Sequence, residues 1–97
     1  MDKRLANFEW DENKATLNFE KHGVRFEDAA ETFFDEDFIR IFDEKHSEKE
    51  IRYAGTGKHP SGAMLVTIYT ERGDTFRIIS SRKANKKERH EYENSKS

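Results

Sequence analysis

The stretch MLVTIYTERGDTFRIIS, residues 64–80, contains two runs of β-branched and aromatic residues separated by the short polar segment ERGD. Such runs are typical of β-strands, and a short polar segment with a glycine is typical of a tight turn. We therefore expect strands at 64–70 and 75–80 that pair in an antiparallel hairpin. The other predicted strands can be added to this hairpin to form one sheet.

Two further strand-like runs precede the hairpin, FIRIF at 38–42 and IRYAG at 51–55. Their connections, DEKHSEKE and TGKHPSGA, are polar and short enough to favour an antiparallel meander of four strands. A shorter run, FEW at 8–10, predicts one additional strand near the N-terminus.

Three segments have the spacing of amphipathic helices. The first runs from the N-cap Asp11 to Gly23, because glycine suits the left-handed residue that follows a helix. The second covers about 26–34, and the third covers 84–94 with Asn85 as N-cap of a capping-box-like arrangement. The order of elements predicts an α+β fold, with two N-terminal helices packed on an antiparallel sheet and a C-terminal helix.

Composition predicts one folded domain, residues 1–97, with a highly charged exterior. Charged residues make up 39% of the chain, yet eight Phe, three Tyr and one Trp are too many aromatic residues for a disordered sequence. The absence of Cys excludes a thiol nucleophile and is typical of an intracellular protein, so we expect a cytoplasmic location. No apolar run is long enough for a membrane span. The aromatic residues expected in the core are Trp10, Phe26, Phe33, Phe34, Phe38 and Phe42.

The two halves of the chain carry opposite charge. Residues 1–50 contain 8 Lys and Arg against 15 Asp and Glu, whereas residues 51–97 contain 10 against 5. Six of the late cations lie in RIISSRKANKKER, residues 77–89, where Glu88 is the single acid. This charge density could bind several phosphates of a nucleic acid. The alternative is a solvated helix face with a few ion pairs.

Alternation along TFRIIS predicts how the arginines are distributed over the sheet. Arg77 and Ile79 should share one face of this strand. Phe76 and Ile78 should share the other face, which continues toward Arg82. We expect the late cations to converge in a single pocket once the chain folds.

His22, near the C-terminal end of the first helix, is a candidate general acid or base near neutral pH, with Lys21 beside it as a phosphate contact. The alternative is a histidine that is stabilised by the dipole of its own helix. Asn18 lies on the same stripe of this helix. No chemistry is assigned to the other histidines, and no spacing of histidines and carboxylates predicts a metal site. These histidines are His46, His59 and His90.

Several segments together resemble the BrnT toxins of bacterial type II toxin-antitoxin systems. They are FEWDENKATLNFEKHGVRFEDAAETFFDED, the RY at 52–53 followed by Gly57, MLVTIYTERGD, and RIISSRKANKKERHEYE, and the resemblance covers about residues 8–93. It implies a RelE-like fold and a ribonuclease that blocks translation without a metal or an organic cofactor. It also implies neutralisation by a BrnA-like antitoxin with a ribbon-helix-helix DNA-binding domain, so that operator DNA is contacted only through the antitoxin.

The resemblance places the family's KHG motif on Lys21 to Gly23, and its RIISAR-like motif on 77–82. The ER and Tyr of the last helix fall on Glu88, Arg89 and Tyr92. The chain departs from the family pattern at Ser81, where Ala is usual, and at Ile51, where an acidic residue commonly precedes RY.

RNA can be cut without a metal when its 2′-hydroxyl attacks the adjacent phosphorus, which requires a proton acceptor and cations that stabilise the developing charge. We assign proton transfer to His22 and contact with the scissile phosphate to Arg72 and Arg82. The residues assigned to RNA binding are Lys21, Arg52, Arg77, Lys83, Lys86, Lys87 and Arg89.

Two alternative functions are compatible with the same residues. The chain could be an RNA-binding module without catalytic activity, or an interaction protein whose basic face contacts an acidic partner. The acidic tract at 27–37 is expected to be a solvated face, and its alternative role is contact with basic residues of an antitoxin.

Overall fold

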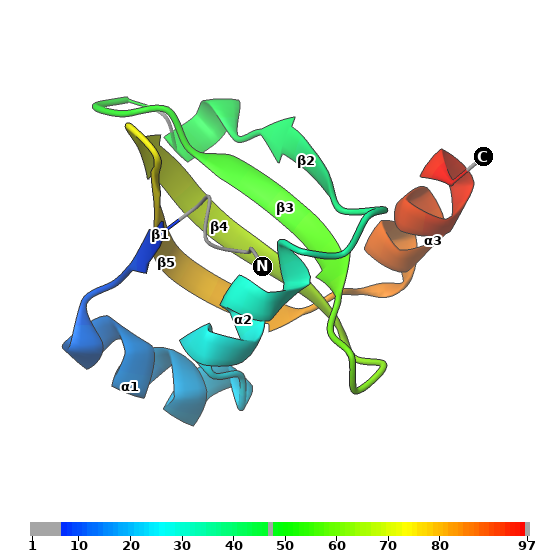
Figure 1. Cartoon of the computed structure of the whole chain (residues 1–97), viewed down its shortest axis with the longest axis horizontal. Coiled ribbons are helices and arrows are strands. Elements are labelled where there is room, and N and C mark those ends of the chain that lie inside the picture. The colour runs from blue at the N-terminus through cyan, green and yellow to red at the C-terminus, as the bar shows by residue number, and fades with distance from the viewer. Residues whose placement is uncertain (1–6, 47, 97) are drawn as a thin grey trace.

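The computed structural model describes residues 7–46 and 48–96, which form three α-helices and one sheet. Figure 1 shows the helices arranged around this sheet. This arrangement confirms the α+β fold predicted from the sequence. Among the described residues, no helix is both long and apolar enough to cross a membrane. Along the chain the elements are β1 (Asn7–Glu9), α1 (Glu12–His22), α2 (Phe26–Thr32), β2 (Ile39–Phe42), the 3₁₀ helix η2 (Glu44–His46), β3 (Tyr53–Lys58), β4 (Met64–Arg72), β5 (Thr75–Lys83) and α3 (Lys86–Ser95).

Both ends of α1 are set by the residues that the sequence pattern predicts. The side chain of Asp11 accepts hydrogen bonds from the backbone N–H groups of Asn13 and Lys14, at 2.8 and 3.1 Å. At the other end, Gly23 has a φ of 71° and donates its N–H to the carbonyl oxygen of Phe19 at 2.8 Å. Because a side chain would disfavour this left-handed conformation, glycine allows the helix to end here and the chain to turn toward α2.

The strands have the order β1-β5-β4-β3-β2, and β2 to β5 form the antiparallel meander expected from the sequence. The first strand is the exception, because β1 pairs with β5 in a parallel orientation. In this pair Glu9 lies opposite Arg77. The chain therefore brings a residue from its first ten positions next to the cationic strand near its C-terminus.

Strand β3 begins later than the sequence predicts, at residues 53–58 rather than 51–55. It contains two glycines, a residue type that strand propensity disfavours. A Cβ atom at Gly57 would lie 2.6 Å from the carbonyl oxygen of Thr32, and one at Gly55 would clash with the ring of Phe38. These glycines therefore serve the close approach of α2 and of Phe38 to the sheet, which local propensity does not reveal.

The core lies between α2 and the sheet. Phe26 and Ala29 of α2 are fully buried and pack with Ile78 of β5. The prediction that Phe34 and Phe42 lie in the core is wrong, because these two residues are 54% and 52% exposed. The reason is that α2 ends before Phe34, while Phe42 is the last residue of the edge strand β2.

Helix α3 lies beside the end of β3, away from α2 (Figure 1). Its N-terminus has the predicted capping box, in which Asn85 and Glu88 each accept a hydrogen bond from the other's backbone N–H at 2.8 Å. Tyr92 is buried and donates its hydroxyl to Asp35 at 2.5 Å. Burial and this hydrogen bond raise the pKa of Tyr92.

The acidic tract makes several contacts within the protein. Burial acts to raise the pKa of Asp35, but hydrogen bonds from Tyr92 and from two backbone N–H groups outweigh it and lower the pKa. Asp37 lies 3.9 Å from the ammonium group of Lys96 on the C-terminal side of α3. The tract thus helps to fix α3, a role that neither the solvated-face prediction nor the partner-contact prediction includes.

Candidate functional site

The sheet has a second surface opposite α2, which we call the open face. Ile78 packs toward α2, and residues directly opposite each other in neighbouring strands share a face. The strand register therefore defines which side chains point the other way. The open face includes Glu9, Ile39, Ile41, Ala54, Thr56, Val66, Ile68, Thr70, Arg72, Thr75, Arg77, Ile79, Ser80 and Arg82.

A β-bulge interrupts the pairing of β4 with β5. Ile68 lies opposite Ser80, but the next residue of β4, Tyr69, lies opposite Ile78. Ile79 is therefore an extra residue of β5 without a direct partner. One extra residue shifts the side-chain alternation on the far side of the bulge.

The bulge brings Arg77 and Arg82 to the same face. Arg77 lies opposite Thr70 and Arg82 opposite Val66, two residues of β4 whose side chains point in the same direction. The prediction that Arg82 shares a face with Phe76 is wrong, because it assumed unbroken alternation. The two arginines that the prediction separated, Arg77 and Arg82, therefore lie on the same surface.

At the end of the open face nearest the β4–β5 turn, one carboxylate lies between two arginines. Oε2 of Glu9 is 3.1 Å from Nη1 of Arg77 and 3.7 Å from Nη1 of Arg72. Nη2 of Arg72 also donates to Glu50 at 3.2 Å. No feature of the sequence pattern singles out Glu9, because its position depends on the parallel pairing of β1 with β5.

At the opposite end, Arg82 forms a two-pronged contact with Glu88. Its Nη1 and Nη2 donate to the two carboxylate oxygens at 2.8 and 2.7 Å, a geometry that suits the planar guanidinium. The hydrogen bond from Arg82 lowers the pKa of Glu88, and the same contact raises the pKa of Arg82. The contact links the end of β5 to the capping box of α3.

Arg72 and Arg82 are far apart. Arg72 lies opposite Thr75, and Arg82 follows later on the same strand, so the two positions are separated by about 20 Å at roughly 3.3 Å per residue. Their guanidinium groups are also held by different carboxylates, Arg72 by Glu9 and Glu50 and Arg82 by Glu88, so in this structure they do not form one phosphate site. The prediction of a single pocket is therefore wrong for this pair, while their roles in cleavage stay predictions.

His22 lies on α1, a helix beside the edge of β5, and not on the open face. Helix α1 starts after β1 and is fixed to β5 by Asn18, whose Nδ2 donates to the carbonyl oxygen of Ser81 at 2.8 Å and whose Oδ1 accepts from the Ser81 N–H at 3.0 Å. His22 lies one helical turn beyond Asn18, still farther from Arg72. Within the described residues, His22 makes no hydrogen bond or ion pair with Arg72 or Arg82.

Most cations assigned to RNA binding lie on the surface. Lys87 and Glu88 border a groove of about 320 Å³ between α3 and the open face. Lys21 is exposed at the C-terminal end of α1, away from this groove. The exposed cations around β5 and α3 are Lys83, Lys86, Lys87 and Arg89.

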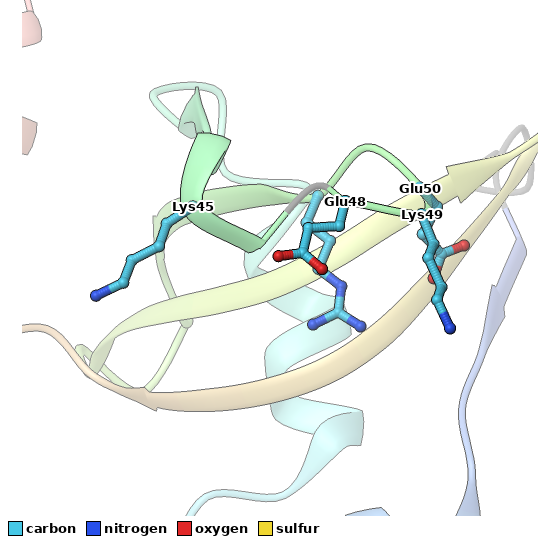
Figure 2. A pocket seen from close by; sticks show the side chains of 5 residues that line it. Lys45, Glu48, Lys49 and Glu50 are labelled. Carbon is cyan, nitrogen blue, oxygen red and sulfur yellow. The ribbon is translucent and has the colours of Figure 1, made fainter.

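Arg52 lies in a different part of the molecule, on the segment that connects η2 to β3. With neighbouring charged residues it lines a cavity of about 330 Å³. Figure 2 shows Lys45, which lies in η2, and Glu48, Lys49 and Glu50, which lie on the segment before β3. The segment is attached to β4 through Thr70, whose hydroxyl donates to the carbonyl oxygen of Ile51 at 2.7 Å.

One group in the described residues has the composition of a metal site, consisting of Asp28, Glu31 and His59. Its hydrogen bonds favour a different role. The backbone N–H of Ser61 donates to Nδ1 of His59 at 3.0 Å, so the neutral ring carries its proton on Nε2. Nε2 lies 2.6 Å from Glu31 and can donate to it. The group joins the β3–β4 turn to α2.

Comparison with known proteins shows the family. Residues 10–88 match the family described as "Ribonuclease toxin, BrnT, of type II toxin-antitoxin system". The chain belongs to this family. The fold is similar to that of the Brucella abortus ribonuclease toxin BrnT, with a TM-score of 0.64 and 21% sequence identity over 84% of this chain and 99% of that one. No curated protein matches the chain.

Membership in a type II system implies that the partner is a protein antitoxin. Within the described residues, the open face carries arginines at both ends, Arg72 and Arg77 at one and Arg82 at the other. Between them lie small or apolar side chains such as Ile79 and Ser80.

Proposed function

We propose that this chain is an endoribonuclease that cleaves RNA on the open face without a metal ion. The 2′-hydroxyl of the substrate attacks the adjacent phosphorus, and arginines on β4 and β5 stabilise the negative charge that develops on the phosphate oxygens. The products are a 2′,3′-cyclic phosphate and a 5′-hydroxyl.

The observation that supports this proposal most directly is the bulge in β5. By shifting the alternation, it aligns Arg77 and Arg82 along one face with Arg72. Arginines spaced along a strand match a chain of phosphates better than a single pocket does. The RNA backbone then runs along β5, and each end of the row contacts a different phosphate.

In this arrangement Arg82 has a competing partner. Both of its terminal nitrogens contact Glu88, and the two side chains are 43% and 21% exposed. A phosphate at this end must therefore replace the carboxylate of Glu88. Lys83, Lys86, Lys87 and Arg89 are assigned to flanking phosphates, and Lys21 and Arg52 to more distant parts of the RNA.

Cleavage by the purified chain tests the proposal. A 5′-labelled RNA is incubated with the protein in the presence of EDTA, and the expected result is cleavage with 2′,3′-cyclic phosphate ends. Arg77→Ala is expected to reduce the rate about 100-fold, as when one donor to a developing oxyanion is removed. Arg25→Ala, an exposed arginine between α1 and α2, is the matched control. His22→Ala tests the proton-transfer role assigned from the sequence.

Two results would contradict this function. Loss of all activity in EDTA, restored by a divalent ion, would refute cleavage without a metal. If the wild-type protein binds RNA but does not cleave it, the alternative function of a non-catalytic RNA-binding module is favoured instead.

We further propose that the protein antitoxin is BrnA-like, with a ribbon-helix-helix domain that carries the contact with operator DNA. The test is co-purification of this chain with the product of a neighbouring reading frame, followed by an operator mobility-shift measurement. The toxin alone should not shift the operator, whereas the complex should. A shift by the toxin alone would contradict this division of roles.

A further inference from the structure

Glu9 is the carboxylate of the open face that lies closest to two arginines. Its side chain is 42% exposed, and those of Arg77 and Arg72 are 31% and 51% exposed, so all three can be reached by a substrate. Both arginines approach the same oxygen, Oε2. In the part of the chain that the structure describes, Oε1 of Glu9 accepts no hydrogen bond.

The other acids and bases near the arginines are less suited to accept a proton. Both oxygens of Glu88 are engaged, because Arg82 contacts each of them and the N–H of Asn85 contacts Oε1 as well. Glu50 contacts Arg72 only, among the described residues. His22 lies on the far side of the Asn18 contact. A general base must be within hydrogen-bond reach of the proton that it removes, which favours Glu9.

We propose that Glu9 is the catalytic base of the RNA cleavage reaction, an inference that rests on the ribonuclease function proposed above. A phosphate bound by Arg72 and Arg77 places the neighbouring ribose beside Oε1 of Glu9. The carboxylate takes the proton of the 2′-hydroxyl as the bond from O2′ to phosphorus forms and the bond from phosphorus to O5′ breaks. Solvent water protonates the leaving O5′, and protonated Glu9 then returns its proton to water.

The two arginines have a second role in this step. In the free protein they fix the orientation of Glu9 through Oε2. When the phosphate binds, their remaining N–H groups are available for its oxygens, because a guanidinium carries five donors. The cluster therefore places a proton acceptor and two stabilising cations at one phosphate, whereas Arg72 and Arg82 lie at opposite ends of the open face.

Glu9→Gln tests the proposal because glutamine keeps an oxygen that can accept from Arg77 but cannot act as a base. The expected result is a loss of about 10²- to 10⁴-fold in the cleavage rate, while RNA binding is unchanged or slightly tighter. In the wild type, the rate should fall at acid pH as the base is protonated, and this limb of the pH profile should be absent in the variant. Glu20→Gln, an exposed acid on α1, is the matched control.

The outcomes separate this proposal from the function on which it rests. Wild-type protein that does not cut RNA refutes the ribonuclease function itself and, with it, the role of Glu9. Cleavage by the wild type together with near-normal cleavage and the same acid limb in Glu9→Gln refutes the role of Glu9 alone. If Glu9→Gln does not fold, Glu9→Asp is used instead, because aspartate retains a carboxylate. Cleavage by Glu9→Asp whose rate falls at acid pH supports the role of Glu9 as the base. Cleavage by Glu9→Asp whose rate does not fall at acid pH refutes this role.

Discussion

Replacing Asn18 by alanine should destabilise the protein strongly, because this side chain connects α1 to β5 and to the segment between α1 and α2. Asn18 is buried, and its Nδ2 donates to the carbonyl oxygens of Ser81 and Val24 at 2.8 and 3.1 Å. Its Oδ1 accepts from the N–H of Ser81 at 3.0 Å. The amide thus occupies the edge of β5 where β1 has already ended, in the way that a neighbouring strand would.

The magnitude follows from the groups that lose their partner. Asn18→Ala leaves one buried N–H and two buried carbonyl groups without the asparagine, and each such group costs about 1–3 kcal/mol. Partial access of water to the vacated space reduces the sum, so we expect a loss of about 3–5 kcal/mol. This is a large part of the roughly 5–15 kcal/mol that stabilises a typical domain.

Urea unfolding, followed by the fluorescence of Trp10 and by circular dichroism, measures the effect. A loss of this size should lower the unfolding midpoint by about 2–3 M, for a denaturant slope of about 1.5 kcal/mol per M. Asn13→Ala on the exposed side of the same helix is the control, with an expected change of less than about 0.5 kcal/mol. A midpoint for Asn18→Ala within about 0.5 M of the wild type would refute the assignment of these hydrogen bonds as a main attachment of α1.

Three further predictions concern α3, the Arg82 contact and β3. The raised pKa of Tyr92 keeps its hydroxyl protonated in the folded state, so the contribution of this hydroxyl to stability is complete below the ordinary tyrosine pKa of about 10 and is lost as pH rises above it. Tyr92→Phe should therefore reduce the pH dependence of the unfolding free energy between pH 9 and 11 by up to about 1.4 kcal/mol per pH unit. An unchanged pH dependence in Tyr92→Phe would contradict this prediction. Glu88→Gln should tighten RNA binding about fivefold, because a neutral side chain competes less with phosphate for its arginine partner. Glu91→Gln, one turn farther along α3, is the control and should change the RNA affinity less than twofold in the same titration. Equal changes of affinity in the two variants would indicate a general effect of charge rather than competition for Arg82. Gly57→Ala should lower the free energy of unfolding by about 1–3 kcal/mol, because the new Cβ would lie 2.6 Å from a backbone carbonyl oxygen of α2. An unchanged urea midpoint would show that this contact relaxes easily.

The candidate site shows where reasoning from the sequence was sufficient and where it was not. The cationic strand and the hairpin were predicted correctly, because β-branched runs and a short turn are local features. The distribution of Arg77 and Arg82 over the two faces was predicted wrongly, because a single extra residue, Ile79, reverses the alternation. No feature of the residues around Ile79 distinguishes a bulge from a regular strand.

The contact of Glu9 with Arg72 and Arg77 could not have been predicted in the same way. It depends on a parallel pairing between residues that are 68 positions apart in the chain. The pattern of β1 predicts a strand but not its partner, and a strand of three residues has little periodicity from which to infer a register.

The sequence by itself determined the kind and order of the elements and the ends of two helices, since Asp11, Gly23 and the capping box of Asn85 and Glu88 act within a few residues of their own position. Only the tertiary structure decided which charged groups meet. Pairing register, the bulge and the position of β1 result from the packing of the whole sheet against α2, and that packing selects among arrangements that local sequence leaves equally favourable.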